Sequence, residues 1–187
     1  MGTQTVKVSA AMMRQQFRPC DPEFIATTCK AACCRSTTSP TGIAVTVTDD
    51  LEADRVRALG AQVDGLSIVA VNKRCPFQGA DNMCSIWNTA QPWGCSVSPF
   101  TLNKNNTLIV RNRYRSLKCY RAEGSMPAYH AHRKALEALL GVDQTDALVA
   151  HLDAGGGDIH VAVDDHKVAW LHAKNSLSTT NREETPQ

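Results

Sequence analysis

The chain has 187 residues, which is enough for one compact domain with a hydrophobic core and at most a small appendage. Lys and Arg number 20 against 18 Asp and Glu, and 43% of the residues are hydrophobic, so an intrinsically disordered chain is excluded. Eight cysteines are more than core packing usually needs, and they are the main indication of function.

The N-terminal segment lacks a basic region followed by about 7 to 15 apolar residues, so no secretory signal is predicted. No apolar run approaches the roughly 18 residues of a membrane span. We therefore expect a cytoplasmic protein without a membrane partner. Clustered cysteines in a reducing compartment are more often metal ligands or redox groups than disulfides, although eight cysteines also fit four disulfides in an oxidising one.

The cysteines lie in the first two thirds of the chain, and the histidines follow them. We predict one α+β domain over residues 1–175, small and loop-rich, organised around a Cys-ligated metal site. Its Cys-rich part spans residues 15–122, and a helical C-terminal extension spans residues 123–175. The polar residues 176–187 are predicted to be a disordered tail.

Within the Cys-rich part, alternating apolar residues over 43–47 predict a strand. A helix follows, because Asp49 is a good N-cap with Glu three positions on and Gly60 is placed to end the helix. Its apolar face is predicted to include Leu51 and Leu59. Two further strands are predicted over residues 66–72 and, after an Asn105-Asn106 turn, over residues 107–114.

In the C-terminal extension, the apolar spacing predicts one amphipathic helix from Pro127 to Gly141 and a second helix that Asp143 or Thr145 caps. Alternation over residues 159–163 predicts a short strand. The apolar segment after it is expected to bring Trp170 into the core.

The segment from Cys75 to Pro99 contains three prolines and two glycines and has no regular apolar period. Burial alone would therefore hold it poorly. A metal held by thiolates from separate loops would fasten it. The spacing reads Cys29-x3-Cys33-Cys34 followed by Cys75-x8-Cys84-x10-Cys95. The paired Cys-x2-Cys knuckles of zinc ribbons and the closely spaced cysteines of bacterial ferredoxins are absent.

The adjacent pair Cys33-Cys34 would strain to place both sulfurs on one tetrahedral ion. Either one of the two is not a ligand, or more than one metal is bound. Thiolate ligands select zinc, Cu(I) or iron in clusters, and the spacing does not choose among these metals.

Three segments resemble the YkgJ-type cysteine-cluster family of zinc- or iron-chelating domains. They are Cys29-Lys30-Ala31-Ala32-Cys33-Cys34, then Cys75-Pro76-Phe77-Gln78 with Cys84-Ser85-Ile86-Trp87, and Gln91-Pro92-Trp93-Gly94-Cys95-Ser96-Val97-Ser98-Pro99-Phe100. The similarity covers residues 15–122. The chain departs from the family in the wider gap between Cys20 and Cys29, and in Gln91 and Ser96, where the family usually has arginine.

The resemblance implies that zinc or iron, with an iron-sulfur cluster as one form, is bound by a set of cysteines: Cys29, Cys33, Cys34, Cys75, Cys84, Cys95 and Cys119. Cys20 is an additional candidate ligand or, alternatively, a buried thiol. The family includes a lysine methylase of flagellin, so a metal- or iron-sulfur-dependent enzyme that acts on a protein or nucleic acid is the alternative function.

Basic residues recur between 111 and 121 without an intervening acid. On a strand, Arg111, Arg113 and Arg115 would share one face, which could bind an anionic partner such as nucleic acid. The alternative is a solvated edge strand that its charges keep from aggregating. The phosphate-binding, dinucleotide-binding, zinc-protease and serine-hydrolase motifs are all absent, so no catalytic residue is assigned.

Overall fold

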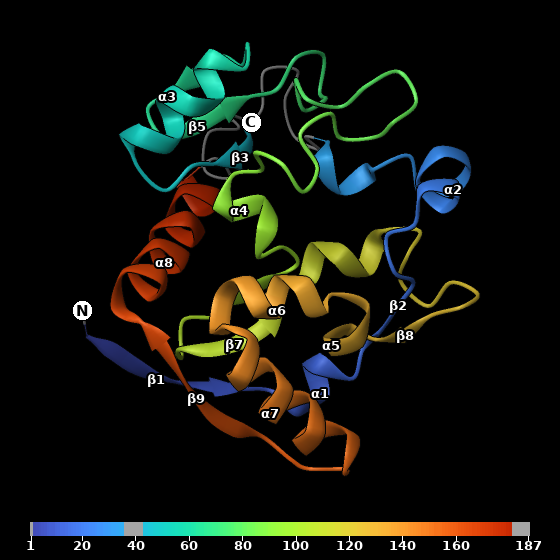
Figure 1. The fold of residues 1–187 in the computed structure, drawn as a ribbon, viewed down its shortest axis with the longest axis vertical. Coiled ribbons are helices and arrows are strands. Elements are labelled where there is room, and N and C mark those ends of the chain that lie inside the picture. The colour runs from blue at the N-terminus through green and yellow to red at the C-terminus, as the bar shows by residue number, and fades with distance from the viewer. Residues whose placement is uncertain (1, 36–42, 181–187) are drawn as a thin grey trace, which may run out of the picture. The chain divides into compact units, whose positions relative to one another are not determined.

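The computed structural model describes residues 2–35 and 43–180, and it combines helices and strands as the sequence predicts (Figure 1). The chain forms two compact units. The first unit comprises Met1–Gln15, Pro99–Arg111 and Pro127–Gln187, and the second comprises Gln16–Ser98 and Asn112–Met126. All eight cysteines belong to the second unit.

This division differs from the predicted single domain, in which one Cys-rich part spans residues 15–122. Residues 99–111 instead join the two ends of the chain in the first unit. The reason is strand pairing, because β1 (Thr3–Val8) pairs in parallel with β7 (Thr107–Val110) and antiparallel with β9 (Ile159–Asp164). The first, middle and last parts of the chain therefore share one sheet.

The sheet of the first unit has the order β6-β7-β1-β9, and Figure 1 shows β9 running beside β1. A tight turn joins β6 (Phe100–Leu102) to β7, and in it Asn106 has a left-handed φ of 55°. Asn103 Oδ1 accepts hydrogen bonds from the N–H groups of Asn105 and Thr107. The predicted Asn105-Asn106 turn and the predicted strand over residues 159–163 are confirmed.

The helices described in the first unit are α1 (Ala10–Met13), α5 (Ala128–Ala131), α6 (Arg133–Leu140), α7 (Val142–Asp153) and α8 (Asp165–Thr180). The helix predicted from Pro127 to Gly141 is interrupted at His132, whose φ of −124° separates α5 from α6. Gly141, with a φ of 82°, ends α6 and is the N-cap of α7. The predicted caps Asp143 and Thr145 therefore lie inside α7.

The segment after β9 is helical, and α8 buries Val168 and Leu171. Trp170 is only partly buried, so the expectation that it enters the core is wrong. Helix α8 continues to Thr180, so residues 176–180 are helical where a disordered tail is predicted. The rest of that predicted tail, residues 181–187, lies outside the described residues.

The second unit has short elements: β2 (Gln16–Phe17), α2 (Pro22–Phe24), the π-helix η1 (Ile25–Cys29), the 3-10 helix η2 (Ala32–Cys34), β3 (Ile43–Thr46), α3 (Asp50–Ala58), β4 (Val63–Asp64), β5 (Ser67–Val69), α4 (Trp93–Ser96), the 3-10 helix η3 (Asn112–Ser116) and β8 (Met126–Pro127). Strand β2 pairs with β8, and the other strands form a sheet in the order β3-β5-β4.

Both long strands predicted in the Cys-rich part are shorter in the structure. The strand predicted over residues 66–72 is β5, and the chain turns after it through Asn72 and Lys73, which have left-handed φ values of 50° and 63°. The strand predicted over residues 107–114 ends at Val110, and η3 follows it. The predicted strand over 43–47 is confirmed as β3.

Helix α3 is capped as predicted, since Asp49 Oδ1 accepts a hydrogen bond from Glu52 N at 2.8 Å. Its predicted apolar face is wrong, because Leu51 is 82% exposed and Leu59 is 46% exposed. The helix instead turns Glu52, Ala53 and Val56 inward. The small core behind it is an apolar cluster: Val47, Ala53, Val56, Ala61, Ile68, Cys75, Phe77 and Ile86.

Across residues 2–35 and 43–180, no helix combines the length and the apolar character needed to cross a bilayer.

His132 gives the first unit a specific pH dependence. Its ring lies edge-on to Phe100, with 6.4 Å between the ring centroids, and desolvation lowers its pKa to about 4. Between pH ~6.5 and ~4 the unfolded chain binds a proton at this position and the folded chain does not, so stability falls as the pH falls. We expect this one residue to remove roughly 2–3 kcal/mol of unfolding free energy between pH 7 and 4.5.

Urea unfolding at the two pH values measures this loss. The His132→Gln variant should lose less stability than the wild type, and a variant of the exposed residue His166, His166→Gln, serves as the control. Equal losses in wild type and His132→Gln would show that His132 does not carry the effect.

Candidate metal centre

We call Cys20, Cys29 and Cys119 of the second unit the Cys20 group, since the segments of Cys20 and Cys119 pair with each other and a short helical stretch leads from Cys20 to Cys29. The chain before Cys20 is bonded to the chain around Cys119, because Arg18 N donates to Cys119 O at 2.8 Å. Phe17 forms a β-bridge with Tyr120, and their ring centroids are 5.2 Å apart. Two segments that are about a hundred residues apart in sequence are thereby held side by side.

Cys29 is connected to Cys20 by a short helical stretch. Asp21 caps α2 by accepting a hydrogen bond from Phe24 N at 2.8 Å, and the chain continues directly into η1, which ends at Cys29. The hydrogen bond from Phe24 lowers the pKa of Asp21, so its carboxylate stays charged at the helix N-terminus. A π-helix is uncommon and is frequently found at functional sites.

The chain turns sharply between Cys29 and Cys33. Lys30 and Ala31 both adopt the left-handed conformation, with φ values of 51° and 46°. Each costs about 1–2 kcal/mol for a residue with a Cβ atom, so the surrounding contacts must hold the turn. Lys30 O accepts two hydrogen bonds, one from Arg35 Nη2 at 3.1 Å and one from Gln78 Nε2 at 3.0 Å.

Four further cysteines are Cys34, Cys75, Cys84 and Cys95, which we call the Cys75 group; the first three lie at the apolar cluster of the second unit. Cys75 N donates to Cys34 O at 3.0 Å, and Gln78 forms a β-bridge with Cys84. Cys75 is buried in the cluster, and Cys34 and Cys84 pack against it.

Cys95 is positioned by the buried carboxylate of Glu52. It lies on α4, and the first residue of that helix, Trp93, donates its N–H to Glu52 Oε1 at 2.8 Å. The other carboxylate oxygen, Glu52 Oε2, accepts from Thr48 N at 2.8 Å. Glu52 is only 9% exposed, so these charge-assisted hydrogen bonds tie α4 firmly to α3.

Cys33 lies between the two groups. Its sulfur is 3.9 Å from the sulfur of Cys34, and Arg113 Nη2 donates to Cys33 O at 2.7 Å. The hydrogen bond from the Cys34 thiol, opposed by desolvation and aided by the Arg113 guanidinium, lowers the pKa of Cys33 to about 7. The same hydrogen bond, together with desolvation, raises the pKa of Cys34.

The charge of Cys33 reaches members of both groups. Desolvation, followed by the charges of Cys33 and other thiols, raises the pKa of Cys20 to about 12 and that of Cys119 to about 11. Desolvation also raises the pKa values of Cys29, Cys75 and Cys84, and the Cys33 charge adds to each increase. The charge of Cys95 likewise adds to the increase in the pKa of Cys34. Each of the eight thiols thus interacts electrostatically with at least one other.

The sulfurs gather without already forming a coordination shell. Within the described ranges, no three Cys, His, Asp or Glu side chains are arranged as a ready set of metal ligands. All eight cysteines are free thiols. Cys20 is exposed as a residue, although desolvation acts on its thiol.

Two further arginines place positive charge beside the Cys75 group. Arg35 follows Cys34 and Arg74 precedes Cys75, and the two arginines are joined by a β-bridge. Both guanidinium groups donate to Asn82 Oδ1, at 3.4 Å and 3.2 Å. Their shared acceptor ties the segments that carry Cys34 and Cys75 to the loop around Asn82.

The predicted arginine face is not formed. Arg111 belongs to the first unit, whereas Arg113 and Arg115 lie on η3 in the second unit. The expectation that the three arginines share a strand face is wrong, because β7 ends at Val110. Arg113 instead contacts Cys33, a role that the sequence pattern did not reveal.

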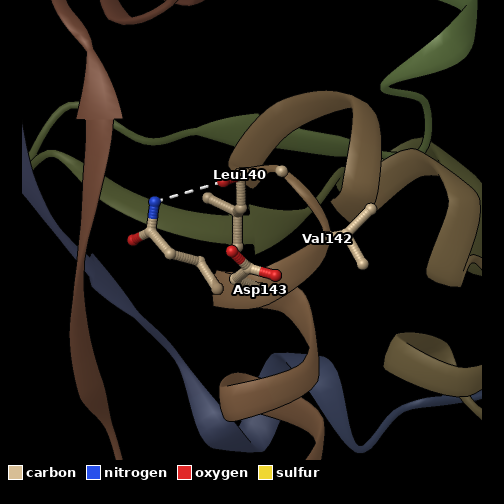
Figure 2. A pocket seen from close by; sticks show the side chains of 5 residues that line it. Leu140, Val142 and Asp143 are labelled. Carbon is tan, nitrogen blue, oxygen red and sulfur yellow. Dashed lines mark hydrogen bonds between the residues drawn. The ribbon is translucent and has the colours of Figure 1, made fainter.

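The first unit has a small pocket lined by Leu140, Gly141, Val142, Asp143 and Gln144, at the turn between α6 and α7 (Figure 2). Gln144 Nε2 donates to Leu140 O at 3.1 Å and to Ala162 O at 3.0 Å. Ala162 N donates in return to Gln144 Oε1 at 3.0 Å. The Gln144 amide therefore forms hydrogen bonds with the outer edge of β9. We assign the residues of the pocket the structural role of covering this sheet edge.

No family model matches the chain, and neither a curated protein nor a solved structure matches it. The resemblance to the cysteine-cluster family therefore remains a prediction from the residues quoted above.

Glu52 provides a test of how α4 is held. Glu52→Ala leaves the N–H groups of Thr48 and Trp93 without their acceptor, and we expect it to lower the free energy of unfolding by about 2–4 kcal/mol. Asp54→Ala, which removes an exposed partner of Arg57 on the same helix, should change it by less than about 0.5 kcal/mol. Chemical denaturation compares the two variants, and similar losses in both would refute this role of Glu52.

Proposed function

We propose that this protein is a cytoplasmic metal-binding protein that holds zinc or iron, including iron in an iron-sulfur cluster, through its cysteine thiolates. The observation that supports the proposal best is that free thiols from separate segments lie close enough for Cys33 to interact electrostatically with six of the others. Free thiols belong in a reducing compartment, and soft sulfur ligands prefer zinc and iron-sulfur clusters.

The electrostatics of the thiols support a cation among them. Desolvation and mutual repulsion raise the pKa of most of these cysteines, so several thiolates cannot form together without compensating charge. A bound metal supplies that charge and releases the protons. The guanidinium group of Arg113 supplies part of it from the protein, at Cys33.

The fold of the second unit gives the metal a structural role. Its core is a small apolar cluster, and residues 75–99 have little regular structure apart from the four-residue helix α4. A structural zinc site contributes about 10–16 kcal/mol, which is comparable to the roughly 5–15 kcal/mol that stabilises a whole domain.

Elemental analysis and an absorption spectrum of protein purified without oxygen test the proposal. Stoichiometric zinc in colourless protein, or iron with sulfide and broad visible absorption, would support it. Protein that carries neither metal after purification, and that does not bind added zinc or iron when reduced, would refute it.

Removal of the metal should also unfold the second unit. We expect exhaustive chelation under reducing conditions to lower the melting temperature strongly, because the ligand loops lose their shared anchor. Differential scanning calorimetry measures the change, and re-addition of the metal should restore it. An unchanged melting profile after complete metal loss would show that the metal does not hold this unit together.

A further inference from the structure

Cys33 and Cys34 form a pair of thiols whose sulfur atoms lie close together. The two residues are neighbours in the 3-10 helix η2, and their sulfurs are 3.9 Å apart. Adjacent side chains on a helix normally point in different directions, so the local backbone must bring these two sulfurs together. Both thiols are free and both residues are partly exposed, so a small oxidant can reach them.

The backbone of the pair is held by contacts from two other segments. Cys33 O accepts a hydrogen bond from Arg113 Nη2 at 2.7 Å, and Cys34 O accepts one from Cys75 N at 3.0 Å. The pair also follows directly on the left-handed turn at residues 30–31. Such strained backbone persists only where the surrounding structure holds it, and it is concentrated at functional sites. The approach of the two sulfurs is therefore imposed by the fold of the second unit.

We propose that Cys33 and Cys34 are a modification site, a dithiol that a hydroperoxide oxidises reversibly to a disulfide between the two adjacent residues. This inference goes beyond the proposed metal binding, because the reaction needs only the two thiols and the peroxide. It uses the one property that separates this pair from an ordinary buried cysteine, which is a second sulfur already in place.

The reaction takes two steps. One sulfur attacks a peroxide oxygen, so that an S–O bond forms, the O–O bond breaks, and the leaving hydroxide becomes water with the proton that the thiol gave up. The second sulfur then attacks the resulting sulfenic acid, so that the S–S bond forms, the S–O bond breaks, and a second water leaves with the other thiol proton. Two thiols and one hydrogen peroxide thus become one disulfide and two waters. Because the sulfurs start 3.9 Å apart, the second step is intramolecular and precedes further oxidation.

The disulfide should be easy to reduce. Adjacent Cα atoms are about 3.8 Å apart across a trans peptide, which is less than the roughly 4.4–6.8 Å that a disulfide usually spans. The ring that the two cysteines close is therefore strained, and strained disulfides are reduced more readily than structural ones. We expect glutathione at millimolar concentration to restore both thiols.

One tryptic peptide reports on the pair. Trypsin cleaves after Lys30 and Arg35, which releases residues 31–35 with Cys33, Cys34 and no other cysteine. The full-length protein as purified is treated with hydrogen peroxide, its remaining thiols are alkylated, and the digest is analysed by mass spectrometry. We expect this peptide to lack alkyl groups and to be lighter than its reduced form by the mass of the two thiol hydrogens. Glutathione added before alkylation should return it to the doubly alkylated form.

Single substitutions provide the controls. Cys33→Ser and Cys34→Ser each remove one partner, so neither variant should form a disulfide within this peptide. Cys20→Ser removes an exposed cysteine and keeps the pair, so it should form the disulfide as the wild type does. Far-UV circular dichroism checks that each variant is folded.

The outcomes separate this inference from the proposed function. A peptide that stays doubly alkylated after peroxide treatment would overturn the inference, and so would a disulfide from Cys33 or Cys34 to a cysteine of another peptide. A disulfide that glutathione does not reduce would contradict the reversible modification. The internal disulfide in protein that binds neither zinc nor iron would support this inference while the proposed function fails.

Discussion

The main physical constraint on the second unit is the free-energy cost of bringing many sulfur atoms close together. A thiolate in a partly desolvated site is costly, and each one makes the next harder to form. Cys33 escapes this cost because the Cys34 thiol donates to it and Arg113 lies beside it, but the thiols around it have raised pKa values. The folded chain therefore gathers thiols whose protonated form is favoured. A cation that replaced the protons would turn mutual repulsion into attraction, and this change is the physical basis of the metal binding that we propose.

The contacts around the thiols are arranged to hold loops, because regular structure is scarce there. The left-handed residues Lys30 and Ala31 impose a sharp turn that the hydrogen bonds from Arg35 and Gln78 to Lys30 O stabilise. Glu52 stabilises the position of α4 in a similar way, since its buried carboxylate accepts a hydrogen bond from the N–H group of Trp93 at the start of that helix. Hydrogen bonds of polar groups thus hold these segments in place, a role that an apolar core has in larger domains. These hydrogen bonds hold the chain beside the cysteines, and a bound metal would hold the cysteine sulfurs themselves.

Local features of the fold were predictable, whereas features set by distant contacts were not. The Asp49 cap, the Asn105-Asn106 turn and the strands β3 and β9 follow from residue spacing, because their hydrogen bonds lie close in sequence. The face of α3 was wrong because Glu52 bonds to Trp93, 41 residues away, and turns Leu51 outward. The two units were missed for a similar reason, since β1 pairs with strands near the middle and the end of the chain. A pattern read along one segment carries no information about such partners.

The candidate site shows the same boundary between what sequence reveals and what folding adds. The cysteine spacing identified the thiols, and the adjacent pair Cys33-Cys34 already indicated that one tetrahedral ion does not suit them all. The pairing of the segments around Cys20 and Cys119 could not be derived from the sequence, because it is made by contacts such as that of Phe17 with Tyr120, which are far apart in the chain. Arg113 was misjudged for a related reason: a strand would have turned it outward with Arg111, whereas the 3-10 helix η3 brings it to the carbonyl of Cys33. The end of β7 at Val110 thus changes a residue expected to bind an external anion into one that supports a thiolate.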